Sequence, residues 1–222
     1  MRFSLLKNSL WLVALCLCAQ EQKPPGPPAA PSEMKRMSPR AGPGDYQAHA
    51  QAGAVTVGAE FMRHAIPTPG GEFTNENYVA VEVGLFGAPG ARTKISIGDF
   101  SLRINGKKAV PSQLFGIVFS DLKDPSWEPP EPPKPKGGGL TTDAGGGGGN
   151  SNDPPPAPPK MPLPLVRVMQ QKVEGAAIPE GDRPLPEAGL LFFPYRGKSE
   201  AIKSVELTYS GPAGKATLTL QP

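Results

Sequence analysis

The side chains that most often carry out chemistry are scarce in this sequence of 222 residues. It contains two histidines, His49 and His64, and two cysteines, Cys16 and Cys18. A metal site usually needs three or four His, Cys or carboxylate ligands at close spacing, such as His-x-x-x-His, and no such spacing occurs here. We therefore expect no metal site and no bound cofactor, and we interpret both histidines as solvated.

His64, which follows a predicted strand, is the candidate base for hydrolase chemistry. Serines and aspartates accompany it, but the Gly-x-Ser-x-Gly turn that presents a nucleophilic serine is absent. The carboxylate pair of a glycosidase is defined by distance in space rather than by spacing, and Asp99 has the residue type and position of a turn. We expect a protein that is not an enzyme and has no catalytic residues, with a hydrolase site near His64 as the alternative.

Glycine runs and basic residues indicate neither a nucleotide nor a nucleic acid as ligand. The run at residues 145–149 is followed by Asn-Ser-Asn-Asp and prolines instead of the Lys-Ser/Thr of a phosphate-binding loop. Lys and Arg number 23 against 20 Asp and Glu, and they form no stripe that would match a polyanion. The small cluster of Lys35, Arg36 and Arg40 is interpreted as solvated linker charge, with contact to an anionic surface as the alternative.

The N-terminus has the features of a signal peptide. Arg2 and Lys7 supply a positive start, and residues 10–19 form an apolar run of about ten residues before the chain turns polar. A membrane-spanning helix needs roughly 20 apolar residues, so we expect no stable membrane span after cleavage. Residues 1–20 are therefore predicted to be removed, and the mature protein to be periplasmic or secreted.

Both cysteines lie within this signal. Cleavage after Cys18, Ala19 or Gln20 leaves a chain without cysteine, which fits a bacterial envelope protein stabilised by burial better than a disulfide-rich secreted domain. Lipidation of Cys16 or Cys18 is the less favoured alternative, because a leucine rather than a small residue precedes each.

Proline and glycine divide the chain into segments. The 30 prolines and 27 glycines make about a quarter of all residues, which is the range of low-complexity sequence. Residues 21–53 are predicted to be a disordered Pro-rich tether, and residues 128–164 a disordered Pro/Gly insertion. The folded part is one β-domain, residues 54–222, in which roughly 130 residues remain to build a core.

Alternating apolar and polar residues, the pattern of a half-buried strand, recur along this domain. Residues 78–86 are the strongest case, and we expect that strand to be central. Asn105-Gly106 favours a type I′ turn and predicts a hairpin with a returning strand at 107–110. The other predicted strands are residues 54–61, 94–97, 100–104, 188–195, 202–209 and 216–220.

Two segments have more than one interpretation. Residues 165–173 combine good helix formers with β-branched residues, so a short helix and a strand both fit. Residues 114–119 fit a strand or a packed loop. About seven short strands with turns between them predict an all-β fold, an immunoglobulin-like antiparallel β-sandwich.

Aromatic residues supply candidate contacts for a ligand. An aromatic platform for sugars is one use of them, but core packing is the expected role of at least half. Trp127, with prolines nearby at the start of the insertion, is named as a candidate partner contact. The residues considered for the platform are Tyr78, Phe100, Phe192, Phe193, Tyr195 and Tyr209.

The order of four segments resembles a known family. Residues 78–83 (YVAVEV), 99–108 (DFSLRINGKK), 189–193 (GLLFF) and 202–209 (IKSVELTY) follow the order seen in bacterial extracytoplasmic immunoglobulin-like domains of the DUF4352 kind. The long insertion and the segment around Met169 depart from that pattern. The resemblance implies an exported accessory or binding module.

We therefore expect an exported, non-catalytic module that binds or scaffolds an unidentified protein or surface polymer at the cell envelope. A structural spacer, in which the Pro/Gly tracts set the reach between surfaces, is a further alternative.

Overall fold

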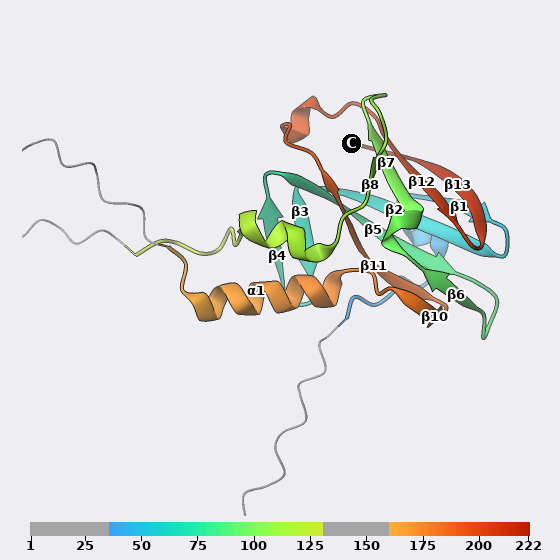
Figure 1. Ribbon diagram of the computed structural model, residues 1–222, viewed down its shortest axis with the longest axis horizontal. Coiled ribbons are helices and arrows are strands. Elements are labelled where there is room, and N and C mark those ends of the chain that lie inside the picture. Colours follow the sequence, from blue (N-terminus) through green and yellow to red (C-terminus); the bar gives the residue numbers. More distant parts are fainter. Residues whose placement is uncertain (1–35, 131–159) are drawn as a thin grey trace, which may run out of the picture. The chain divides into compact units, whose positions relative to one another are not determined.

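Two antiparallel sheets of four strands each form the main sandwich (Figure 1). The computed structural model describes residues 36–130 and 160–222. The first sheet has the order β1 (Ala48–Ala52), β2 (Val55–Arg63), β5 (Tyr78–Phe86) and β11 (Glu187–Pro194). The second has the order β13 (Gly214–Leu220), β12 (Val205–Gly211), β7 (Phe100–Ile104) and β8 (Val110–Pro111). The predicted all-β antiparallel sandwich is confirmed.

The main core lies between these two sheets. Period-two alternation sends every second side chain of β5 inward, where it meets Leu102 of β7, Leu207 of β12 and Leu218 of β13. β5 lies between β2 and β11, so the expectation that it is central is also confirmed. Its inward residues are Val79, Val81, Val83 and Leu85, each at most 1 % exposed.

The outer face of the first sheet carries a second core. Ala80 of β5 and Phe192 of β11 point away from the sandwich and pack with Met169 and Val173 of the helix. This arrangement explains why β5 and β11 are buried along nearly their whole length. The elements of this layer are α1 (Leu163–Ala176), the 3-10 helix η3 (Phe115–Asp121), and the small sheet of β3 (Ala65–Thr68), β4 (Gly71–Asn75) and β9 (Leu122–Lys123).

The structure decides the two open segments. Residues 165–173 belong to the helix α1, and residues 114–119 lie mainly in η3, so they are not a strand. The described residues contain thirteen strands rather than about seven, because short strands such as β10 (Gly181–Pro184), the partner of β6 (Arg92–Ile95), show no alternation of apolar and polar residue types. The strand predicted at residues 94–97 corresponds to β6, which begins and ends two residues earlier.

The folded domain begins before residue 54, where we placed its start. Residues 48–52 form β1, which pairs with β2 along its whole length, and residues 36–46 pack on the first sheet. Residues 36–53 are therefore not part of a disordered tether. The helix α1 likewise starts at Leu163, inside the range assigned to the insertion. The predicted signal, the rest of the tether and residues 131–159 lie outside the described residues.

The predicted hairpin at Asn105-Gly106 is present, with a later return. Both residues have positive φ, 54° and 67°, as a type I′ turn requires. The returning strand begins at Val110 rather than at Lys107, with Val110 opposite Leu102. The Asn105 side chain donates to the carbonyl of Ala201 and accepts from the amide of Lys203, so the turn is tied to the loop before β12.

Candidate functional site

We expected His64 to be solvated, but both of its ring nitrogens lie against backbone carbonyl groups. Its Nδ1 lies 2.8 Å from the carbonyl oxygens of Asn75 and Tyr78, and its Nε2 lies 2.8 Å from that of Gly197. Because carbonyl oxygens only accept, each contact requires a hydrogen on the ring nitrogen. The ring of His64 therefore faces backbone carbonyl groups on both sides, and the described hydrogen bonds include none from His64 to a serine or another nucleophile. His49 is exposed on β1, as expected.

Asp99, the carboxylate considered for chemistry, lies in a turn. Asp99 ends a short 3-10 turn and is half-buried, and this burial raises the pKa of its carboxyl group. Within residues 36–130 and 160–222, no group of three or more His, Cys, Asp or Glu side chains is placed to hold a metal ion. Among these same residues, no helix is long and apolar enough to cross a membrane.

The aromatic residues considered for a sugar platform mostly serve the cores. Four of the six are buried: Phe100, Phe192, Phe193 and Tyr209. Tyr78 and Tyr195 are half-buried. Trp127 is also half-buried, and its amide donates to the carbonyl of Asp124 to close a turn.

A groove opens beside β11, the edge strand of the first sheet. Two segments reach this edge: the amide of Gln113 donates to the carbonyl of Phe192, and the amide of Ile178 donates to that of Leu190. Between them lies a cavity of about 250 Å³. Its apolar lining includes Phe115 together with Ile178, Leu190 and Phe192, and charged residues of both signs line it as well: Arg36, Glu174, Glu180 and Arg183.

One exposed large apolar side chain, that of Leu114, lines this groove, and three others lie on the same elements of the outer layer. In the described part of the chain they occur only on α1 and at η3, two elements that contact one another. Leu114, which also lines the groove, is 58 % exposed, and Leu163 is 72 % exposed. Ile117 and Val168 complete the set, which we call the apolar surface. Where exposed apolar side chains form a contiguous patch, the patch often marks a site of interaction.

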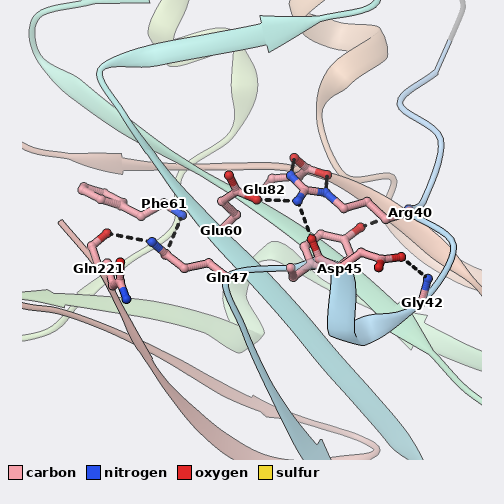
Figure 2. A network of polar contacts seen from close by, with 9 residues as sticks. Arg40, Gly42, Asp45, Gln47, Glu60, Phe61, Glu82 and Gln221 are labelled. Carbon is pink, nitrogen blue, oxygen red and sulfur yellow. Dashed lines mark hydrogen bonds and ion pairs between the residues drawn. The ribbon is translucent and has the colours of Figure 1, made fainter.

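A polar site, separate from the groove, lies on the outer face of the first sheet. There Arg40 bridges two carboxylates (Figure 2). Its Nε and Nη2 donate to Glu82 at 3.1 and 2.7 Å, and its Nη1 lies 2.5 Å from Glu60. The same Nη1 donates to the carbonyl of Asp45. The hydrogen bonds to Glu82 keep the pKa of Arg40 above its ordinary value. The interpretation of Arg40 as solvated linker charge is therefore wrong.

Tyr46 completes this site. Its ring lies 4.6 Å from the guanidinium carbon of Arg40, within cation–π range, and packs edge-on against Phe86 at 5.8 Å. Below the ring are two glycines directly opposite each other, Gly58 on β2 and Gly84 on β5. Burial raises the pKa of the Tyr46 hydroxyl group.

The described part of the molecule is thus a two-sheet antiparallel β-sandwich with an additional layer, an apolar surface, and a segment, residues 40–46, that is bound to the outer face of the first sheet. No known protein family, curated protein or solved structure matches it. The resemblance to the DUF4352 kind of domain stays a prediction.

Proposed function

We propose that this chain is an exported, non-catalytic β-sandwich module that binds a partner protein at the bacterial cell envelope. The observation that carries this proposal is that, among the residues that the structure describes, the exposed large apolar side chains lie only on α1 and at η3, and that one of them, Leu114, lines a groove with further apolar residues. A surface of this kind loses ordered water when a partner covers it, which favours association.

The chemistry of this surface favours a protein over a surface polysaccharide. Sugar rings bind well to exposed faces of aromatic side chains, whereas four of the six aromatic residues considered lie in the cores. Leu114, Ile117, Leu163 and Val168 are aliphatic, and mixed charges line the groove, as at the polar rim of a protein interface. The carbonyl contacts of His64 favour a non-catalytic role over a hydrolase.

Photo-crosslinking in the native host tests this proposal. A photoreactive residue at position 117 should form a crosslink to one partner, whereas the same residue at Thr217, exposed on β13 in the second sheet, should not. Leu114→Glu together with Val168→Glu should abolish that crosslink. Gln51→Glu with Thr217→Glu adds the same charge at exposed sites on other strands and should leave it intact. Equal crosslinking from both positions would refute an apolar binding surface. Trp127→Ala tests the remaining candidate contact in the same assay.

A further inference from the structure

Four residues on the outer face of the first sheet are unfavourable choices for a sheet by itself. Gly58 pairs with Gly84, and the next outward pair is Glu60 with Glu82. Like charges directly opposite each other weaken strand pairing. Glycine in a strand interior also weakens the strand and often marks a place where another group approaches closely. We call these four residues the arginine–tyrosine slot.

Each unfavourable feature matches one side chain of the segment that lies on it. The carboxylates of Glu60 and Glu82 together bind the guanidinium group of Arg40. A Cβ atom placed on Gly58 would come within 2.7 Å of the Tyr46 ring, and one on Gly84 would collide with the Tyr46 hydroxyl group. Tyr46 is 5 % exposed as a result. The slot therefore has the shape and charge of a receptor for an arginine and a tyrosine six positions apart.

We infer that the arginine–tyrosine slot is a binding site for residues 40–46 of a second copy of this chain as well as for its own. All contacts of this segment with the slot are non-covalent, and the segment lies before β1 with only Gln47 between them. A segment from another copy would make the same contacts with the slot, and Met37, which precedes it, would make its hydrogen bond to the Gly175 carbonyl in that copy as well. The link at Gln47 must change direction, and its side chain is hydrogen-bonded to the amide of Phe61 and the carbonyl of Gln221. This inference is independent of the apolar surface.

The ion pair at the slot is open enough to be broken. The Arg40 side chain is 29 % exposed and that of Glu60 is 33 % exposed, so water can reach the pair as it separates. An emptied slot then holds two carboxylates without their cation, which favours capture of any available segment of the same chemistry. Within one chain its own segment has the advantage of proximity, so exchange needs a high local concentration of chains.

Two complementary variants of the full chain test the exchange. The donor-defective variant, Arg40→Ala with Tyr46→Ala, keeps the slot but loses the two side chains that bind in it. The acceptor-defective variant, Glu82→Gln with Gly84→Ala, keeps the segment and blocks the slot. The two variants, one of them labelled with ¹⁵N, are unfolded, mixed and refolded together, and native mass spectrometry then measures the oligomers.

The mixture should give heterodimers about tenfold more abundant than the homodimers of either variant alone. Mixtures that stay monomeric although both variants fold would overturn the inference. If the donor-defective variant does not fold alone, circular dichroism of the mixture decides. Recovery of its folded signal when the acceptor-defective chain is present supports exchange, and no recovery refutes it.

Discussion

Removal of Arg40 leaves two carboxylates facing each other across β2 and β5, and we expect Arg40→Ala to be strongly destabilising. Glu82 is the critical partner, because its side chain is only 10 % exposed and accepts two hydrogen bonds from the guanidinium group. Loss of one partner from a buried pair costs about 3–5 kcal/mol. Since water reaches Arg40 and Glu60, we place the loss in unfolding free energy lower, at about 2–3 kcal/mol.

The assay is equilibrium unfolding in urea, with a matched arginine as control. Arg92→Ala breaks the pair with Asp182, whose side chains are 53 % and 64 % exposed, and it should cost about 0–1 kcal/mol. Adding Glu82→Gln to Arg40→Ala should restore about 1 kcal/mol, because the like-charge pair disappears. The denaturant slope should stay constant across the variants. If the losses for Arg40→Ala and Arg92→Ala agree, the reasoning about the buried carboxylate is refuted.

Three further predictions concern buried polar groups. Asn75 is fully buried and its side chain donates to the carbonyl of Val118, so Asn75→Ala should lower the unfolding free energy by about 2–4 kcal/mol in urea titrations; a loss below about 1 kcal/mol would contradict this. Because burial raises the pKa of Tyr46, the folded chain holds the phenol proton more tightly, and stability should fall as pH rises above about 10. Tyr46→Phe should flatten that fall, and an unchanged slope would count against it. Burial likewise raises the pKa of Asp99, so its contribution is fully present below pH 3.8 and is lost as pH rises through the raised pKa. Asp99→Asn should therefore raise the melting temperature at neutral pH relative to the parent chain, and this gain should vanish in acid.

Most strands of the two main sheets could be predicted from their apolar residues, but β1 was assigned to the tether. In β7 and β12 the apolar side chains alternate with polar ones, and both were located from that pattern. β5 was predicted with its observed ends, since Tyr78 to Phe86 is rich in valine and is followed by a glycine turn. The short strands β8, β9 and β10 hold two to four residues, too few for a period to appear.

The second core could not be predicted from single segments. Phe192 and Leu190 were expected to belong to one strand, but nothing local indicates that their side chains face a helix while Leu191 and Phe193 face the other sheet. A strand buried on both faces loses its alternation. The helix α1 was one of two interpretations, because residues 165–173 combine good helix formers with β-branched residues.

The bound segment at residues 40–46 was not predicted, because its composition is that of a linker whereas its contacts are made with distant strands. Arg40 lies among prolines and glycines, which favour a linker, yet its partners come from strands 20 and 42 residues later. The available signal was Glu82, a charged residue in the middle of a strand that is otherwise apolar. A buried carboxylate needs a cation, and only the fold reveals which arginine supplies it.

The double burial of β5 also bears on how faithfully the chain can fold. In a sheet with one wet face, a strand that pairs one residue out of step exchanges its apolar row with its polar row. In β5 the same error would push Glu82 between the two sheets and place the valines beneath α1 and the Arg40 segment. One slipped pairing thus damages both cores and separates Glu82 from its cation. Out-of-register pairings of β5 should therefore be unfavourable from an early stage of folding, whatever the lengths of the loops around the strand.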